Sequence, residues 1–454
     1  MPDSPAPTPS RSRRAAALWL RDPERALALL GPPERISDTD GLGLSVAAWL
    51  LLIQHRDEAA ADAAARRALA APAGDTRLAS AALAELLARR GEHAQAAEVL
   101  EAAHAKLPHQ FWYVLSIADE LAAAGEIERA EVLLEAHAEH PRLRRHTLKR
   151  LSQQALARGD RERARRWFRE LIDLPRADQY IVYASDYLTF GDLLRDLGAQ
   201  DEAREIYRRG AEIYLRNAPL RERLAALGET VETPPPSIPP VDEAAAGVRR
   251  IPVRTPYINA RTDMVALIEE ATRDVREPGD VVVLAESPAA NGQGRVVSLE
   301  LVEPSPLAER LCRYVGAIGP LHSPEGMEGA IMVAGRGRVI AGAVAGAAGK
   351  LARRRGWFYR VAGPQTAMID DVAAAVAPYD HHLLPGPSDP DGLAERLAAA
   401  VGSPAAVVDA NHLTGAWVVG ASAGVDREWL AAALADNPAG NEDERTPVVL
   451  VRRV

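Results

Sequence analysis

The sequence predicts two architectures in one chain, an all-α array of helical repeats followed by a domain that mixes strands and helices. From about residue 14 to 228 the chain is rich in Ala, Leu, Arg and Glu, with apolar residues at helical spacing and little that indicates strands. After Gly247, β-branched runs such as Val281 to Leu284 alternate with Ala-rich helical stretches. This alternation is typical of an α/β or α+β domain.

A proline-rich segment separates the two halves. Residues 229–240 contain five prolines, which disfavour both helix and sheet and give an extended spacer. We therefore expect a disordered N-terminus over residues 1–13, helical repeats over 14–228, a linker over 229–247 and a second domain over 248–454. Because each half carries its own hydrophobic pattern, we also expect residues 1–228 to fold independently.

The helical half repeats with a period of 34 residues. Glycines recur at Gly91, Gly125 and Gly159, small residues follow at Ala96, Ala130 and Ala164, and a further copy has Gly198 and Ala203. The glycine allows a tight turn between two helices, and the alanine allows the helices to approach closely. This pattern resembles the tetratricopeptide repeat, whose concave face commonly holds a peptide or a partner helix.

Two interpretations of the array remain open. Its partner is an unknown protein or peptide, or the array only dimerises or shields its neighbour. Aromatic side chains are candidate ligand anchors, although aromatics at helical spacing more often form the core between repeats; they are Trp112, Tyr113, Trp167, Phe168 and Tyr180.

Composition excludes several classes of function. The net charge is −9 and no long basic block occurs, so nucleic acid is not an expected partner. The single cysteine, Cys312, cannot form an internal disulfide, which favours a cytoplasmic location. No apolar run of about 18 residues occurs, so we expect neither a membrane span nor a membrane partner.

Familiar catalytic motifs are absent from the second half. Lys350 is followed by Leu351 in a glycine-rich stretch that lacks the spacing of a phosphate-binding loop. No serine lies in a nucleophile elbow. The adjacent histidines His381 and His382 would point to opposite faces of a strand, which argues against a zinc site.

Carboxylates remain as candidate functional groups. Asp370 and Asp371 are adjacent, Asp380 follows a Pro-Tyr pair, and Asp409 ends an apolar run and is followed by Asn411. A strand's carboxyl end is where α/β folds place ligand-binding groups. Oxygen donors of this kind suit Mg²⁺ or Mn²⁺ bound together with substrate phosphates. Each aspartate taken alone is also a common turn or helix-cap residue.

Four stretches of the second half resemble the coenzyme F-420:L-glutamate ligase family, in a divergent bacterial branch. They are GDVVVLAESPAANGQGRVVSLE, the segment from RGWFYR through MIDD and PYDHH, AAVVDANHL and DNPAGNEDE. For this half the resemblance implies an α+β ligase-like domain that can form a homodimer, so the expected fold is an all-α tetratricopeptide-type solenoid followed by that domain. It implies amide-bond formation between a small acid and an amine, with GTP or ATP and a divalent metal. Asp370 and Asp409 match the family's metal-associated aspartates.

The chain departs from the family in its first signature. Ser287 and Asn291 stand at lysine positions and Gln293 at a glutamate, whereas Gly294 and Arg295 are kept. We expect Arg295 to contact phosphate, Asn411 to help bind the nucleotide, and Asp371 and Asp380 to assist the metal. We consider two alternative functions. The first is a metal- and nucleotide-dependent amide ligase of the gamma-glutamyl type with an attached repeat array. The second is a non-catalytic nucleotide- or metabolite-binding protein on the same tetratricopeptide scaffold. Retained aspartates favour the first, and missing lysines favour the second.

Overall fold

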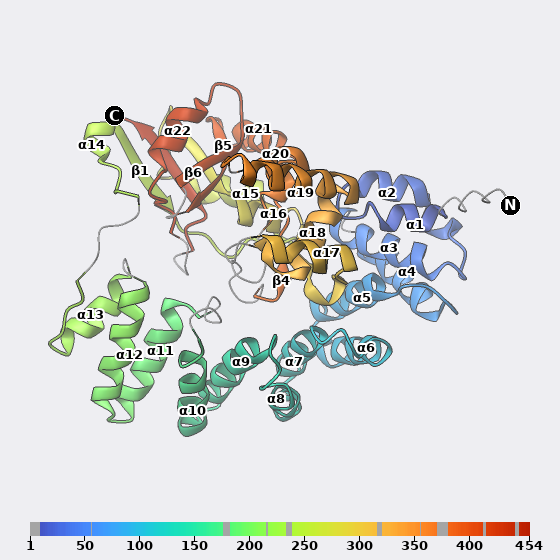
Figure 1. The fold of residues 1–454 in the computed structure, drawn as a ribbon, viewed down its shortest axis with the longest axis horizontal. Helices are drawn as coiled ribbons and strands as arrows, with labels where there is room; N and C mark the ends of the chain where they lie inside the picture. The colour runs from blue at the N-terminus through green and yellow to red at the C-terminus, as the bar shows by residue number, and fades with distance from the viewer. Residues whose placement is uncertain are drawn as a thin grey trace. The chain divides into compact units, whose positions relative to one another are not determined.

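The computed structural model describes residues 10–55, 57–175, 182–214, 217–232, 238–315, 320–354, 356–369, 380–411, 415–440 and 445–454 (Figure 1). The chain divides into two compact units, each built from segments that are distant in sequence. Unit 1 contains residues 1–147, 296–373 and 381–385, and unit 2 contains residues 148–295, 374–380 and 386–454. Each unit is described below by itself.

The repeats form helical hairpins, as the 34-residue spacing predicts. The helices of the four best copies pair as α5–α6, α7–α8, α9–α10 and α11–α12; their bounds are α5 Arg77–Arg89, α6 His93–Lys106, α7 Tyr113–Ala123, α8 Ile127–Ala136, α9 Arg144–Ala157, α10 Arg161–Ile172, α11 Ala184–Asp196 and α12 Gln200–Ile213. Before these hairpins lie α2 (Pro23–Leu30), α3 (Gly41–Leu50) and α4 (Glu58–Ala70), and α13 (Ala218–Ala226) follows the last hairpin.

The residues that identify the repeat take the predicted roles. The turn glycines of the four hairpins all have φ between 77° and 81°, a left-handed conformation that favours glycine; they are Gly91, Gly125, Gly159 and Gly198. The small residues that follow them are fully buried; they are Ala96, Ala130, Ala164 and Ala203. The tetratricopeptide-type prediction is therefore confirmed.

Unit 1 joins the early helices to a segment from the second half of the chain. Besides α2–α8 it holds α1 (Arg11–Ala16), so helical structure begins before residue 14, the predicted start of the repeats. The later segment supplies α17 (Pro306–Leu311), α18 (Pro324–Ala334), α19 (Arg336–Leu351) and α20 (Trp357–Ala362). A two-stranded antiparallel ribbon of β3 (Val297–Ser298) and β4 (His382–Leu383) completes the unit.

Side chains of the repeats hold this later segment directly. The Gln110 side chain donates to the carbonyl of Val302 at 3.0 Å. Arg77, on α5, forms an ion pair with Glu303 at 2.9 Å. These contacts explain why the unit crosses the proline-rich linker, since part of the repeat array has its packing partner some 190 residues away in sequence.

Unit 2 contains a mixed five-stranded sheet in the order β1-β7-β2-β5-β6. The strands are β1 (Val248–Val253), β2 (Val281–Ala285), β5 (Ala405–Asn411), β6 (Gly415–Ala421) and β7 (Val448–Arg453). β2 and β5 are parallel, and the other neighbours are antiparallel. The connection from β2 to β5 includes the whole segment that unit 1 takes from the second half.

Helices cover both faces of this sheet. One core contains Val282, Leu284 and Val407 and is closed by α15 (Met264–Thr272) and α21 (Pro390–Val401). The other contains Val283, Val408 and Leu430, with α22 (Arg427–Ala433) packed against it. Burial on both faces explains why β2 and β5 read as continuous apolar runs. The α+β prediction for this half is confirmed.

Two expectations meet the structure only in part. The units do not follow the composition boundary at 229–247, because each takes part of the repeats and part of residues 248–454; the predicted domain limits stay a prediction. Among the described residues no single helix is long and apolar enough to cross a membrane, and α18 and α19 meet that test only together, across a bend of 117°.

Candidate functional site

The carboxyl ends of β2 and β5 form the edge where unit 2 gathers polar groups. Ala285 pairs with Val408 in the parallel register, so the residues that follow, Glu286 and Asp409, come from adjacent strands at one edge. Glu286 begins α16 (Glu286–Gly292) and is 7% exposed. Such an edge is the usual ligand-binding position of an open parallel sheet.

Asp409 lies half-buried at this edge, as its place at the end of an apolar strand predicts. Burial raises the pKa of Asp409, and a hydrogen bond from the Asn411 side chain offsets only part of that effect. The two residues are two apart on one strand and therefore share a face. Within the described part of the chain no basic side chain contributes to this pKa, so a cation would stabilise the ionised Asp409 carboxylate.

The segment after α16 is tied to the chain before α21. The Gln293 carboxamide oxygen accepts hydrogen bonds from the Ser388 amide at 2.9 Å and from the Ser388 hydroxyl at 3.3 Å. Arg295 donates through Nε to the carbonyl of Gly386 at 2.6 Å. Gln293, which departs from the family's glutamate, thus anchors a loop.

Arg295 is deeply buried. Its side chain is 5% exposed, and burial lowers its pKa to about 10. The guanidinium still carries its charge at neutral pH. A buried cation in the segment that follows α16 suits an anionic ligand, whereas its Nε is already used to position the backbone at Gly386.

Backbone constraints shape the same loop. A side chain at Gly292 would meet Met264 Sδ at 2.7 Å, and Gly294 has φ +68°. The buried carboxamide oxygen of Asn291 has no hydrogen-bond partner within the described part of the chain. A buried acceptor without a partner costs roughly 1–3 kcal/mol, so it marks a position where a donor of a ligand would be favourable.

Asp380 has a different environment from Asp409. Its carboxylate, 1% exposed, receives Nη1 of Arg150 at 3.0 Å and Nη2 at 3.2 Å. Arg150 belongs to α9, so the predicted metal ligand is neutralised by the helical repeats. Asp370 and Asp371 lie outside the described residues. Within the described ranges no three His, Cys, Asp or Glu side chains are grouped as a metal site.

The buried charges around α9 were not predicted from the sequence. Lys149 Nζ forms a 2.8 Å ion pair with Asp186, with both side chains 5% exposed, and lies 4.4 Å from the centre of the Tyr183 ring. Burial, together with Asp380 and Asp186, raises the pKa of Tyr183. In the sequence, Lys149 and Arg150 stand out only as two consecutive basic residues between Leu148 and Leu151.

Unit 1 contains a second group of buried acids. Glu325, in the first turn of α18, is 3% exposed and accepts from Nε1 of Trp112 at 3.3 Å and from Arg142. The Glu300 carboxylate accepts from the Ser116 hydroxyl at 3.0 Å. Trp112, considered above as a ligand anchor, therefore binds a carboxylate of its own chain.

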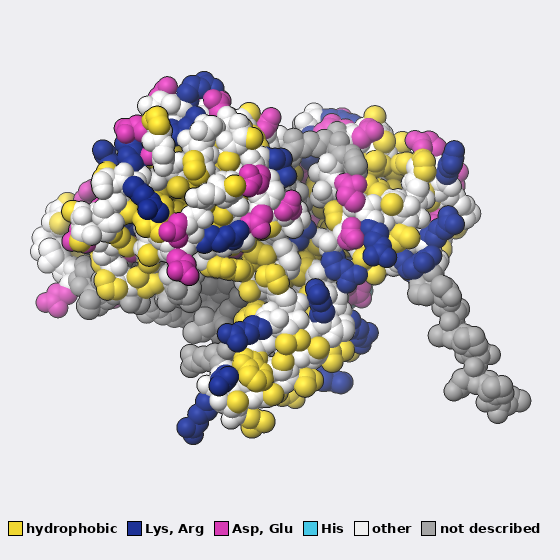
Figure 2. All heavy atoms as spheres, turned by 90° about the horizontal axis from the view of Figure 1, so that it is seen from above, with side chains coloured by type: hydrophobic (Ala, Val, Ile, Leu, Met, Phe, Trp, Pro, Cys, Tyr) yellow, Lys and Arg dark blue, Asp and Glu magenta, His cyan; other side chains and the backbone are white. Residues whose placement is uncertain are grey.

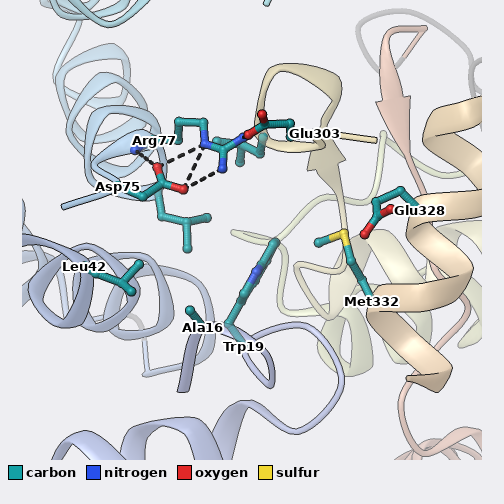
Figure 3. Close-up of a pocket in the computed structure, with 10 residues that line it drawn as sticks. Ala16, Trp19, Leu42, Asp75, Arg77, Glu303, Glu328 and Met332 are labelled. Atoms are coloured by element: carbon teal, nitrogen blue, oxygen red, sulfur yellow. Dashed lines mark hydrogen bonds and ion pairs between the residues drawn. The ribbon is translucent and has the colours of Figure 1, made fainter. Parts of the chain in front are cut away.

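A pocket of about 180 Å³ also lies in unit 1 (Figure 3). Its walls combine apolar side chains, including Trp19 and Met332, with a polar border. Arg77 in that border binds Asp75 and Glu303, at 2.5 and 2.9 Å. The Glu328 carboxylate accepts from the Ser305 amide at 2.9 Å and hydroxyl at 2.6 Å. None of the residues predicted from the sequence lines this pocket.

The described residues fit a divalent cation at one position. Asp409 offers a carboxylate without a basic partner, and Mg²⁺ needs only one or two protein carboxylates because it keeps waters and substrate phosphates. Asp380 does not fit, because Arg150 already balances its charge.

Comparison with known structures gives only distant similarities. PilW, a widely conserved type IV pilus biogenesis factor, is 18% identical with a TM-score of 0.34, covering 48% of this chain and 97% of that one. PilF of Pseudomonas aeruginosa is 15% identical with a TM-score of 0.36, covering 48% and 96%. The Naa15/Naa10 complex bound to HypK-THB is 19% identical with a TM-score of 0.34, covering 48% and 34%.

The family comparison concerns the second half of the chain. No curated protein matches the sequence. The model of the F420-0:gamma-glutamyl ligase family matches residues 252–342, a range that includes β2, α16 and Arg295 and ends before the predicted aspartates. The chain thus carries, next to tetratricopeptide-type helical hairpins, a segment that matches the F420-0:gamma-glutamyl ligase family.

Proposed function

We propose that unit 2 is the reaction centre of a metal- and nucleotide-dependent amide ligase of the gamma-glutamyl type. The observation that carries this proposal is the placement of Asp409, which has no basic partner among the described residues, at the same sheet edge as the loop that leads to Arg295. The family match over residues 252–342 supports the reaction class.

The proposed reaction has two steps. A carboxylate oxygen of the acid attacks the γ-phosphorus of GTP or ATP, and the bond to the departing nucleoside diphosphate breaks. The amine nitrogen of the second substrate then attacks the acyl carbon, releases phosphate and loses its proton to solvent. The products are an amide, a nucleoside diphosphate and phosphate.

The chain's own residues have separate tasks in this proposal. Asp409 and Asn411 would hold a Mg²⁺ or Mn²⁺ ion, which would neutralise charge on the transferred phosphoryl group. Arg295 supplies a buried positive charge for phosphate, and its bond to Gly386 fixes the loop before α21. Asn291 accepts a hydrogen bond from the substrate or nucleotide through its unpartnered oxygen.

We also propose that the early repeats act as a scaffold inside the protein. Gln110, Trp112 and Arg142 bind groups of residues 296–369, so these side chains are occupied by the chain itself. A peptide or protein partner would have to use other surfaces of the array. This differs from the expectation that the aromatic side chains of the repeats capture an external ligand.

The deciding experiment is substrate-dependent phosphate release by the full chain with GTP or ATP and Mg²⁺. Glutamate with a deazaflavin precursor is the first pair, followed by other acids and amines. A ligase releases phosphate only when acid and amine are both present. Asp409→Asn should abolish that release, whereas the matched control Asp201→Asn, at a side chain 94% exposed, should keep it.

A non-catalytic binding protein is the second candidate, favoured by Ser287 and Asn291 at the family's lysine positions. Each missing charge-assisted contact is worth roughly 1.5–3 kcal/mol, so two could cost about two to four powers of ten in rate. Nucleotide binding in calorimetry, without phosphate release for any acid and amine tested, would assign this second function.

A further inference from the structure

The hairpin of α19 and α20 carries an unusual surface. Eleven large hydrophobic side chains are exposed among the described residues, and five of them fall within residues 340–361: Ile340, Val344, Leu351, Tyr359 and Val361. Val344 is 67% exposed and Leu351 is 89% exposed. We call this set, with Tyr314, the hairpin surface. Contiguous exposed apolar patches of this kind usually mark an interaction site.

The inner side of the hairpin has a clear structural role. Side chains added at Gly342 and Gly349 would meet Ala362 at 2.9 Å and Trp357 at 3.1 Å, so small residues let α19 and α20 pack closely. Ile340, Val344 and Leu351 follow one another at intervals of four and seven residues, which places them along one face of α19. That face remains exposed although the opposite one is packed.

The segment that forms this hairpin carries only positive charges. Residues 329–369 contain no Asp or Glu and seven basic residues, in a chain whose net charge is −9. The exposed basic residues stand at both ends of α19 and in α20; they are Arg336, Arg338, Lys350, Arg353, Arg354 and Arg360. Within the described part of the chain these arginines form no ion pair with an acidic side chain, and Lys350 donates to the carbonyl of Tyr314 at 2.8 Å.

Figure 2 shows the combination on the surface, with hydrophobic and basic side chains next to each other at the lower edge of the view, where α19 and α20 lie. An exposed apolar stripe with basic residues at its ends is the pattern of a helix that lies in the interface of an anionic bilayer. Its aliphatic side chains enter the boundary between headgroups and acyl chains, and its basic residues meet the phosphates.

We propose that the hairpin surface binds the surface of an anionic phospholipid bilayer. The association is peripheral, because α18, which would complete a span with α19, buries Met327, Ala330 and Val333 inside unit 1. Neither helix alone crosses a bilayer. This inference is independent of the ligase proposal. It differs from the expectation that no membrane is a partner, which was based on the lack of a membrane-spanning segment in the sequence.

Vesicle flotation of the full chain tests the proposal. The vesicles are phosphatidylcholine alone and an equimolar mixture with phosphatidylglycerol. We expect binding to the anionic vesicles and little to the neutral ones, with binding weakened as salt rises, because the Debye length shortens to about 3 Å at 1 M. The double variant Arg353→Gln, Arg354→Gln should lower the partition coefficient about 25-fold, about fivefold for each charge.

Substitutions at two exposed hydrophobic residues distinguish binding through the hairpin surface from nonspecific hydrophobic adsorption. Val344→Asp should abolish vesicle binding, whereas Val132→Asp, on α8 at a side chain 68% exposed, should leave it unchanged. Both sites are exposed, so circular dichroism should show the wild-type melting temperature in each. For the charge change, the matched control is Arg161→Gln with Arg166→Gln on α10, which should also leave binding unchanged.

Several outcomes would overturn the proposal. Equal loss of binding in Val132→Asp, or no binding to anionic vesicles at low salt, would each reject it. Analytical ultracentrifugation decides between the bilayer and a second copy of the chain. If the wild type is a dimer, Val344→Asp is a monomer and neither binds vesicles, the hairpin surface is a protein interface instead.

Discussion

Arg150 and Asp380 meet in a buried two-point ion pair, with Nη1–Oδ2 at 3.0 Å and Nη2–Oδ1 at 3.2 Å. The arginine lies in the repeats and the aspartate in the second half of the chain, 230 residues later. The pair therefore connects the two halves of the sequence within unit 2. It also gives the Asp380 carboxylate a basic partner, whereas the part that Asp380 takes in a metal site stays a prediction.

Removing either partner of this pair should destabilise the protein strongly. Asp380→Asn or Arg150→Met leaves one buried charge without its partner, which costs about 3–5 kcal/mol. The measurement is the free energy of unfolding in urea. Asp201→Asn, which breaks the exposed pair with Arg204, is the control and should have no measurable effect. A loss of metal affinity in Asp380→Asn with unchanged stability would instead place Asp380 in the metal site.

A fragment that ends at Gly228 should be less stable than the full chain and prone to aggregation. It lacks the segment whose Val302 carbonyl and Glu325 carboxylate are bound by Gln110 and Trp112, and so it exposes surface that unit 1 buries. The measurement is thermal unfolding by circular dichroism together with light scattering. A fragment that unfolds cooperatively at the temperature of the full chain would show that the proline-rich linker, and not the compact unit, defines the folding domain.

Asp409 and Asp280 should have opposite effects on stability as pH changes. Burial raises the folded-state pKa of Asp409, so its ionisation costs stability as pH rises from 3.8 through that pKa. Burial also opposes ionisation of Asp280, but hydrogen bonds from Arg452 and the Glu277 amide outweigh it and lower the pKa. Stability from Asp280 is therefore present above pH 3.8 and is lost as pH falls through its folded pKa.

Asparagine variants of Asp409 and Asp280, measured in metal-free buffer, test whether each ionised carboxylate stabilises or destabilises the folded protein. At pH 7 Asp409→Asn should have a melting temperature equal to or above that of the wild type, and Asp280→Asn a lower one. Functional sites commonly sacrifice stability in this way. A lower melting temperature for Asp409→Asn in metal-free buffer would show that the Asp409 carboxylate has a stabilising partner.

Bound metal should make the Asp409 carboxylate stabilising, so that the wild type melts at a higher temperature than the Asp409 variant. A ligand that binds only the folded state at 100 times its dissociation constant stabilises by about 2.7 kcal/mol. Saturating Mn²⁺ or Mg²⁺ should therefore raise the melting temperature of the wild type and much less that of Asp409→Ala. The exposed Asp201→Ala serves as the matched control and should shift like the wild type. Equal shifts in all three proteins would exclude Asp409 from the metal site.

Replacing Arg295 should separate its two roles. Arg295→Lys keeps a charge but loses the Nε donor to Gly386, and Arg295→Met loses both. If the charge binds phosphate, nucleotide affinity should fall about 10- to 150-fold in Arg295→Met and less in Arg295→Lys. The measurement is calorimetric titration with GTP and ATP. If both variants bind the nucleotides as tightly as the wild type does, Arg295 does not bind phosphate, and its role is limited to the hydrogen bond with the loop before α21.

The local features of the fold were predictable from the sequence. The glycine and alanine positions at a 34-residue period identified the hairpins because turn geometry and close helix contact depend on single residues. The apolar runs identified β2 and β5 because strands buried on both faces need no alternation. The place of Asp409 at a strand end followed from the same run.

The partners of these elements depended on the tertiary structure. Composition placed a boundary at the proline-rich linker, whereas Arg77 and Gln110 find their partners beyond it, at Glu303 and Val302. Asp380 and Asp409 look alike in sequence, yet among the described residues an arginine pairs with Asp380 and none pairs with Asp409. A carboxylate's availability depends on which charge the fold brings near, and one sequence does not record contacts across 230 residues. The chain therefore determined its helices and strands by itself, and the packing between distant segments decided which of its charges remain available for chemistry.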